Sequence, residues 1–211
     1  MVDYDNQPGF AIDANAKQAY QSDIETLIGS LSNYENVIEL GCGSGVFTQF
    51  LMSNVQRIVG ADKNTNQFKK RLPDVRFIHA DFTSQQFIDE MIEREQSFDL
   101  IITRYVIHEL VDPIETFLLW KSLLSYGGRM LLIENTWIRD DWGWDDWGQR
   151  TDDLPLACTQ TWATGAYCLR KAGFTVSKCE WMHSVNQLES TRQKTGFRLY
   201  AIVAEADTDS D

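Results

Sequence analysis

Basic residues are scarce in this chain. Its 211 residues include 19 lysines and arginines against 31 aspartates and glutamates, a formal net charge of −12. Such a charge repels nucleic-acid phosphates and anionic lipid over much of the surface. We therefore expect no nucleic-acid partner, and we interpret the basic cluster Lys69, Lys70 and Arg71 as a solvated face.

Long apolar stretches are also missing. The longest ones, such as Leu100–Ile102 and Met130–Ile133, have the length of a strand, whereas about 20 apolar residues are needed to cross a bilayer. The first residues, Met1 to Phe10, are acidic and polar, unlike a secretory signal. These observations predict a cytoplasmic protein that neither spans nor binds a membrane.

Cysteine and histidine are rare and scattered. No two of the four cysteines have the close spacing of metal ligands, and His79 and His183 have no constellation of partners around them. We therefore expect no metal site, and we predict a reduced environment in which Cys158, Cys168 and Cys179 are buried by packing.

The composition is that of a folded domain with one sizeable core. Hydrophobic residues make up 43% of the chain and aromatic residues 12%, which excludes a disordered class. We expect an N-terminal helical segment at 1–35 that could cap the site, a core at 36–204 with an insert at 137–150, and an acidic tail at 205–211. We expect a monomer or a homodimer.

Short β-branched runs alternate with helical stretches along most of the chain. This alternation predicts a doubly wound α/β domain with a mostly parallel, seven-stranded sheet and a late antiparallel strand. Strands are expected at Asn36–Leu40, Arg57–Ala61, Val75–Ala80, Asp99–Thr103, Arg129–Glu134, Phe174–Met182 and Phe197–Ala204. Helices are expected within 11–32 and at Val46–Ser53, Asn64–Arg71, Ser84–Glu95 and Asp112–Leu124, the last one ended by Gly127 and Gly128.

A glycine-rich turn follows the first expected strand. The segment Glu39-Leu40-Gly41-Cys42-Gly43-Ser44-Gly45 leads into a helix, and glycine lets the backbone turn tightly and approach a ligand. A dinucleotide loop would carry a small residue where this chain has Val46, and Glu39 would oppose a pyrophosphate but attract an ammonium group. A plain tight turn without a ligand is the alternative.

Two further acids end the next expected strands. Asp62 is placed to bind ribose hydroxyls, and Asp81 is placed to accept a proton from an adenine amino group. A single acid at a strand end is more often a helix cap than a ligand. Three successive strand ends that each carry an acid, beginning with Glu39, favour a shared nucleoside site.

With these signals in this order, the sequence resembles the class I S-adenosylmethionine-dependent methyltransferases of small-molecule type. The ordered set from the glycine loop through Phe98–Ile102 and Val106–Leu110 to Tyr126–Ile133 is similar to that family's pattern. The resemblance implies that Gly41, Gly43 and Gly45 wrap the methionine part of the cofactor, that Asp62 holds the ribose, and that Asp81 and Phe82 hold the adenine. We also assign Glu39, Cys42, Lys63 and Thr103 to the cofactor site.

His108 and Glu109 are the candidate catalytic residues. A histidine has an unperturbed pKa of about 6.5, which suits removal of a proton from the methyl acceptor near neutral pH. Many small-molecule members carry a second histidine where this chain has Glu109. Packing or capping of a helix start is the alternative role for His108. Glu134, at the end of the fifth expected strand, is a candidate acceptor-binding residue.

Four tryptophans and four aspartates crowd into residues 137–147. Aromatic faces with nearby carboxylates attract cations by about 0.5–2 kcal/mol per cation–π contact. We therefore predict that Trp137, Trp142 and Trp144 line the acceptor site and that the acceptor carries a basic amine or sits near one. Packing of an inserted segment, or a dimer contact, is the alternative.

The sequence thus predicts an enzyme that transfers a methyl group from S-adenosylmethionine to a small molecule. Two alternatives stay open at this stage. The chain could be a non-catalytic subunit that binds the cofactor and stabilises a partner, or, less in keeping with Val46 and Glu39, an oxidoreductase that uses a dinucleotide.

Overall fold

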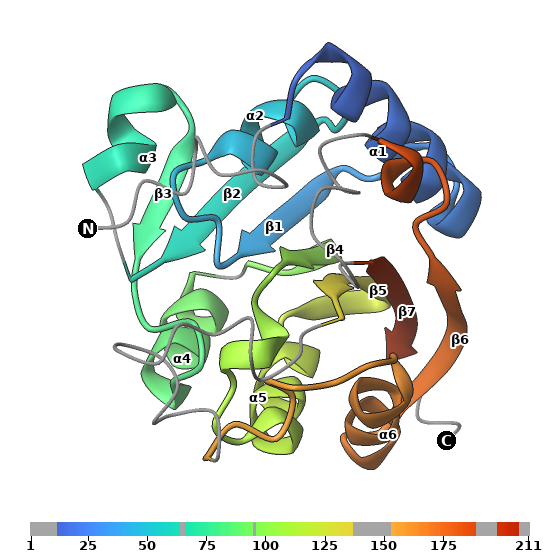
Figure 1. Cartoon of the computed structure of the whole chain (residues 1–211). Coiled ribbons are helices and arrows are strands. Elements are labelled where there is room, and N and C mark those ends of the chain that lie inside the picture. Colours follow the sequence, from blue (N-terminus) through green and yellow to red (C-terminus); the bar gives the residue numbers. More distant parts are fainter. Residues whose placement is uncertain (1–11, 64–65, 95, 137–152, 189–197, 207–211) are drawn as a thin grey trace.

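A seven-stranded sheet forms the centre of the molecule (Figure 1). The computed structural model describes residues 12–63, 66–94, 96–136, 153–188 and 198–206. The strand order is β3-β2-β1-β4-β5-β7-β6, and β7 is antiparallel to both of its neighbours while the other pairs are parallel. The strands are β1 Asn36–Leu40, β2 Arg57–Asp62, β3 Arg76–His79, β4 Phe98–Arg104, β5 Leu124–Asn135, β6 Phe174–Trp181 and β7 Leu199–Ala206. This topology confirms the predicted fold class.

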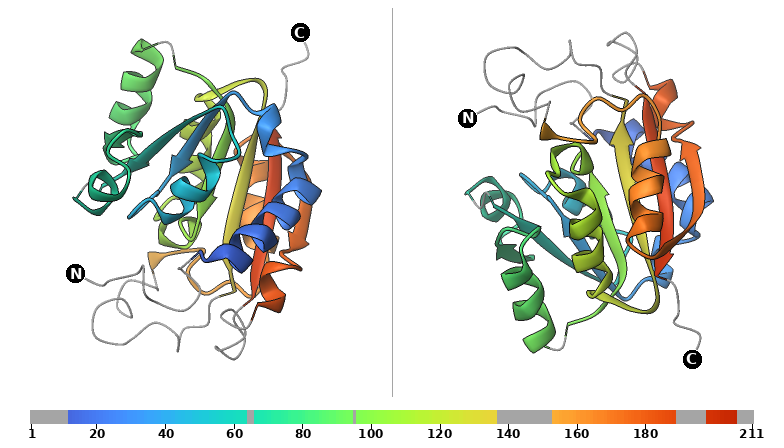
Figure 2. Two further views of the ribbon diagram at one scale, coloured as in Figure 1. Left: turned by 90° about the horizontal axis from the view of Figure 1, so that it is seen from above. Right: turned by 90° about the horizontal axis from the view of Figure 1, so that it is seen from below.

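Helices cover both faces of the sheet, which gives three layers (Figure 2). The helices are α1 Ala14–Ile28, α2 Val46–Leu51, α3 Asn66–Arg71, α4 Gln85–Glu93, α5 Pro113–Lys121 and α6 Ala163–Lys171. One apolar core lies between the sheet and α1 and α2, and a second lies between the sheet and α4, α5 and α6. Within the described residues, no helix has the length and apolar character needed to cross a membrane.

Side-chain caps fix where the helices begin. The Asp13 carboxylate accepts a hydrogen bond from the Ala16 N–H at 2.8 Å at the start of α1. Asp112 does the same for the Glu115 N–H at 3.0 Å, and Pro113 supplies the first residue of α5. Such caps satisfy backbone donors that lack a partner within the helix and contribute about 1 kcal/mol each.

The predicted helix end at Gly127 and Gly128 is wrong, because these glycines lie in a bulge of β5. Helix α5 ends at Lys121, and β5 begins at Leu124. Phe98 pairs with Leu124 while Leu100 pairs with Arg129, so residues 125–128 bulge out of the ladder. Gly127 has φ 73°, and a Cβ at Gly128 would lie 2.9 Å from the Phe98 carbonyl oxygen. Both helix ends and bulges need this backbone freedom, so the glycines alone do not distinguish them.

Helix α6 has no counterpart in the sequence prediction. Its Gly165 lowers the helical character of the segment, since glycine is unfavourable inside a helix. The structure gives the glycine a packing reason, because a Cβ there would lie 3.0 Å from the Ile202 Cδ1 atom of β7. The prediction that Cys158 is buried is also wrong, since this residue is exposed.

Candidate cofactor and acceptor site

The glycine loop between β1 and α2 is fixed at both ends and open in the middle. Gly41, Gly43 and Gly45 all have positive φ, at 74°, 53° and 82°. A Cβ at Gly41 would collide with the Val106 side chain, and one at Gly45 would lie 2.9 Å from the Phe68 ring. At Gly43 no atom of the described residues lies within 4 Å of such a Cβ. The middle of the loop therefore exposes backbone to open space, where a ligand has room to approach.

The end of β2 holds this loop in place. The Ala61 carbonyl oxygen accepts hydrogen bonds from the N–H groups of Gly41 at 2.8 Å and Cys42 at 3.2 Å. The Asp62 carboxylate accepts another from the Gly43 N–H at 2.8 Å. The two sequence signals, the glycines and the acid of the second strand, thus come together at one point of the carboxyl edge of the sheet. Ligands of open α/β sheets bind at this edge.

Asp81 lies in the turn after β3 and is held by local partners. Its carboxylate accepts hydrogen bonds from the Thr83 hydroxyl at 2.6 Å and forms an ion pair with Lys63 at 3.0 Å. Partial burial raises the pKa of Asp81, but Thr83 and Lys63 outweigh it and hold the pKa below its ordinary value. Asp81 is therefore ionised at neutral pH, and its role as an acceptor of hydrogen bonds fits that charge.

Phe82 joins this turn to the glycine loop. Its carbonyl oxygen accepts a hydrogen bond from the Trp120 indole N–H at 2.8 Å. Its ring lies 3.5 Å from the position of a Cβ at Gly41. The Phe82 ring is therefore buried in the apolar core beside the loop, whereas the Asp81 carboxylate next to it is half exposed at the rim.

Glu39 is buried under the loop and does not face solvent. It is 2% exposed and accepts a hydrogen bond from the Thr48 hydroxyl at 2.6 Å. Burial raises its pKa to about 8, against the opposing effects of Thr48 and Arg104. The carboxyl group is therefore mostly neutral at pH 7. From the sequence we expected Glu39 to attract an ammonium group. That attraction requires the ionised carboxylate, which is the minor form of Glu39 at pH 7.

Cys42 contributes its backbone to the loop. Its carbonyl oxygen accepts a hydrogen bond from the Gly45 N–H at 2.9 Å. The side chain packs with Phe68 and Leu72 instead, and burial raises the pKa of the thiol. A thiol that stays protonated in an apolar cluster is inert as a nucleophile.

Arg104 and Tyr105 were not singled out from the sequence, although a charge at the end of an apolar strand is a usable signal. The Arg104 guanidinium carbon lies 5.6, 5.1 and 5.0 Å from the ring centres of Tyr20, Phe47 and Tyr105. Its Nη1 donates to the Tyr20 hydroxyl at 3.3 Å. Tyr105 is a buried non-glycine residue with φ 60°, a strained conformation that nothing in its sequence context announces.

His108 and Glu134 form a buried pair at the carboxyl ends of β4 and β5. His108 lies in a single turn of 3₁₀ helix, Ile107–Glu109, that follows β4, and its Nδ1 is 2.9 Å from the Glu134 Oε2. The other Glu134 oxygen accepts a hydrogen bond from the Asn135 N–H at 2.9 Å. Glu109, with an exposed carboxylate, lies 3.9 Å from His108 Nε2.

The charge state of His108 follows from these partners. Burial by itself lowers the pKa of His108, but the charge and hydrogen bond of Glu134, with a smaller contribution from Glu109, more than offset it. The pKa of the imidazole is therefore raised. Because Nδ1 points at Glu134, Nε2 is the nitrogen that exchanges a proton with anything bound at this rim.

Two buried side chains at the ends of β4 and β5 carry polar atoms without partners in the described residues. Within the described residues, neither the Thr103 hydroxyl nor the Asn135 amide oxygen and nitrogen has a hydrogen-bond partner, although both residues are 0% exposed. An unsatisfied buried polar group costs about 1–3 kcal/mol. Thr103 lies near the end of β4, and Asn135 is the last residue of β5.

The predicted acceptor residues Trp137, Trp142 and Trp144 lie outside the described residues. Among the described residues, no group of three or more His, Cys, Asp or Glu side chains has the arrangement of a metal site. The described site therefore consists of the glycine loop, the three acids, the Arg104 cluster and the His108–Glu134 pair.

The chain belongs to the methyltransferase domain family, which matches residues 12–202. Fold, site and family together define a domain of the class I S-adenosylmethionine-dependent methyltransferases. This confirms the family predicted from the sequence, whose members use S-adenosylmethionine as the methyl donor.

This chain covers only part of the length of the curated relatives that it matches. A trans-aconitate 2-methyltransferase of Escherichia coli O7:K1 (strain IAI39 / ExPEC) is 32% identical over 114 residues, which are 51% of this chain and 42% of that protein. The polyketide synthase-nonribosomal peptide synthetase ACE1 of Pyricularia oryzae is 25% identical over 139 residues, which are 60% of this chain and 3% of that protein. The chain thus spans less than half the length of both.

Solved structures share the fold at low sequence identity. The N-methyltransferase NodS of Bradyrhizobium japonicum WM9, in complex with S-adenosyl-L-homocysteine, has a TM-score of 0.59 and 14% identity, with 93% of this chain and 89% of that chain covered. A SAM-dependent methyltransferase of Archaeoglobus fulgidus has a TM-score of 0.62 and 14% identity, with 90% and 94% covered.

Proposed function

We propose that this chain transfers a methyl group from S-adenosylmethionine to a small-molecule acceptor that docks against His108. The observation that carries the proposal is the buried His108–Glu134 pair, which lies at the same carboxyl edge of the sheet as the glycine loop. Bound S-adenosylmethionine would supply a methyl group already activated on a positively charged sulfur. The residues of the chain then need only align the acceptor, exclude water and take up a proton.

The residues proposed to bind the cofactor follow the rim from β1 to β3. Gly41, Gly43 and Gly45 accommodate the methionine part, and the carboxylates of Asp62 and Asp81 face the ribose and adenine parts. The open space at Gly43 and the ionised state of Asp81 support these roles. Glu39 and Cys42 are proposed to act through the glycine loop and Lys63 through its ion pair with Asp81. Thr103 contributes a buried hydroxyl that has no hydrogen-bond partner in the described residues.

His108 is proposed to remove the proton that the acceptor loses. Glu134 takes the hydrogen bond from Nδ1, so the lone pair of neutral His108 is on Nε2. The raised pKa strengthens the imidazole as a base and shifts the pH at which it becomes available upward. Glu109, beside Nε2, is placed to attract a positively charged group.

A basic amine is the acceptor group that these charges favour. Two carboxylates, those of Glu109 and Glu134, flank one imidazole, and the tryptophan-rich segment 137–147 adds aromatic faces and aspartates to the same part of the chain. Alanine at Trp142 and Trp144 should raise KM for the acceptor much more than KM for the cofactor. An equal effect on both constants would contradict a role in acceptor binding.

A carboxylate acceptor is the second candidate, favoured by the relative named a trans-aconitate 2-methyltransferase. Here protonated His108 would attract the acceptor rather than deprotonate it. The two candidates predict opposite pH dependences. The rate with an amine rises as His108 loses its proton, and the rate with a carboxylate falls.

The test is turnover by the purified chain with panels of amines, phenols and carboxylates, measured as formation of S-adenosylhomocysteine and of methylated product. His108→Gln should lower kcat by about 100-fold for an acceptor that needs a base. Calorimetry with S-adenosylmethionine, S-adenosylhomocysteine and NAD runs in parallel. Binding of the cofactor without turnover on any acceptor would indicate the non-catalytic subunit, and binding of NAD alone would indicate the oxidoreductase.

A further inference from the structure

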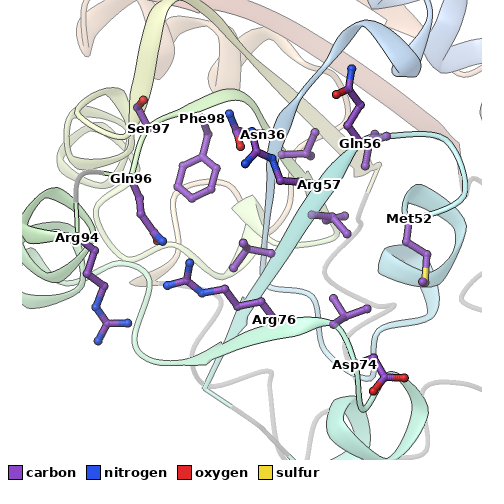
Figure 3. A pocket seen from close by; sticks show the side chains of 15 residues that line it. Asn36, Met52, Gln56, Arg57, Asp74, Arg76, Arg94, Gln96, Ser97 and Phe98 are labelled. Atoms are coloured by element: carbon purple, nitrogen blue, oxygen red, sulfur yellow. The ribbon is translucent and has the colours of Figure 1, made fainter.

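A hollow lies at the amino edge of the sheet, away from the glycine loop (Figure 3). It has a volume of about 670 Å³ and is lined by the starts of β1, β2 and β3 and by the chain that joins α4 to β4. The parallel strand β1 separates it from the carboxyl edge by five residues, or roughly 16 Å at about 3.3 Å per residue. The hollow is therefore a different place from the proposed cofactor and acceptor site.

Three arginines line the hollow. They are Arg57 at the start of β2, Arg76 at the start of β3, and Arg94 after α4, and among the described lining residues Asp74 is the only one with a carboxylate. Three of the 19 basic residues of a chain with a net charge of −12 thus meet in one hollow. Such a local concentration of positive charge attracts anions to a surface that otherwise repels them.

The guanidinium groups of Arg57 and Arg76 are available to a ligand. Within the described part of the chain, neither has an ion pair or a side-chain hydrogen bond. Arg94 has a 3.8 Å contact with Glu90, and both side chains are about half exposed, so this pair is weak. Arg76 and Ile78 lie on the same face of β3, because alternate residues of a strand share a face. Ile78 packs in the core beneath α4, so Arg76 lies on the α4 side of the sheet, and Arg94 directly follows α4.

The other groups that line the hollow indicate which further features a ligand needs besides a negative charge. Gln96 has a buried amide oxygen without a hydrogen-bond partner in the described residues, and this oxygen calls for a donor. The Phe98 ring and aliphatic side chains such as Val59 line the apolar part of the hollow. Figure 3 shows Arg57, Arg76 and Gln96 directed into the same hollow beside the Phe98 ring.

We propose that this hollow binds a small organic phosphate, with the phosphate held by Arg57, Arg76 and Arg94 and an apolar or ring portion packed against Phe98. The fork of a guanidinium group matches two phosphate oxygens, and charge-assisted hydrogen bonds of this kind are stronger than neutral ones. Gln96 accepts a hydrogen bond from a hydroxyl or amino group of the ligand. A flat ring explains the apolar part of the hollow, which a free phosphate ion would not use.

The probe is phenyl phosphate, titrated into the full chain by calorimetry in the presence of saturating S-adenosylhomocysteine, which keeps the probe out of the proposed cofactor site. Phenyl phosphate should bind more tightly than inorganic phosphate, phenol should not bind, and added salt should weaken binding. Arg57→Gln and Arg76→Gln should each raise the dissociation constant at least about tenfold, as expected for loss of a charge-assisted hydrogen bond. Arg170→Gln, an equal charge change at an exposed position of α6, is the matched control and should leave the dissociation constant unchanged.

A second measurement uses the unaltered chain, so its result does not depend on whether the variants fold. Phenyl phosphate should protect Arg57 and Arg76, but not Arg170, from modification by phenylglyoxal, as determined by peptide mass spectrometry. The proposal is overturned by an absence of binding at millimolar probe, by affinity that Arg57→Gln and Arg76→Gln leave intact, or by equal modification with and without the probe.

Discussion

The Nδ1 atom of His108 lies 2.9 Å from the Oε2 atom of Glu134, and both side chains are buried. A buried ion pair is costly to form, because two charges leave water, and it holds only when further hydrogen bonds satisfy the partners. Here Glu134 also accepts from the Asn135 N–H. The pair therefore fixes the orientation of the imidazole and leaves Nε2 as its reactive nitrogen.

Replacing Glu134 by Gln should shift the pH dependence of methyl transfer to an amine. Loss of the carboxylate lowers the pKa of His108, so the rising limb of the kcat profile moves to lower pH, while kcat on the plateau falls by about tenfold because the base is weaker and less well oriented. Steady-state rates from pH 5 to 9 measure both effects. Glu109→Gln, which removes the smaller and exposed contribution to the pKa of His108, should shift the limb less. An unshifted limb in Glu134→Gln would show that His108 is not the base.

Glu39→Gln should change how stability depends on pH. Unfolded glutamate ionises near its ordinary pKa of 4.5, whereas folded Glu39 stays protonated up to about 8. The unfolded state therefore binds fewer protons in this interval, and the wild type loses stability as the pH rises from about 4.5 to 8. The Gln variant lacks this contribution, so it should gain stability relative to wild type by a few kcal/mol between pH 5 and pH 8.5, measured by urea unfolding. Parallel curves for the two proteins would contradict the raised pKa.

Replacing Gly43 or Gly41 of the loop by alanine should distinguish the cost of a strained backbone from the cost of a side-chain collision, both measured as loss of stability. Gly43→Ala introduces only the cost of a side chain at positive φ, about 1–2 kcal/mol, because open space surrounds that position. Gly41→Ala adds a collision with the Val106 side chain and should be the more destabilising of the two. Urea unfolding at one pH ranks them. Equal losses would show that Val106 moves away without cost.

Asp62→Ala should weaken binding of S-adenosylmethionine by at least tenfold while KM for the acceptor changes little. The substitution removes the carboxylate proposed to bind the ribose and also frees the Gly43 N–H. Calorimetry gives the first quantity and initial rates the second. Asp89→Ala, on the exposed face of α4, serves as the control for loss of one negative charge. Unchanged cofactor affinity in Asp62→Ala would remove Asp62 from the site.

Much of the fold was predictable from the sequence because its signals are local. A buried parallel strand such as β4 contains a continuous apolar run, Leu100–Ile102, and the glycine turn after β1 needs backbone conformations that few other residues adopt. The bulge at Gly127 and Gly128 and the helix around Gly165 were not predictable. In both cases the glycine accommodates an atom from a distant part of the chain, the Phe98 carbonyl oxygen or the Ile202 side chain.

The amino-acid sequence by itself determined which residues reach the carboxyl edge of the sheet, because each strand must deliver the residue that follows it there. Only the tertiary structure decided what those residues do electrostatically. Burial makes Glu39 a weak acid, the proximity of Glu134 makes His108 a stronger base, and three aromatic rings enclose Arg104. Desolvation and charge–charge distances depend on every neighbour in space, and no spacing along the chain encodes them.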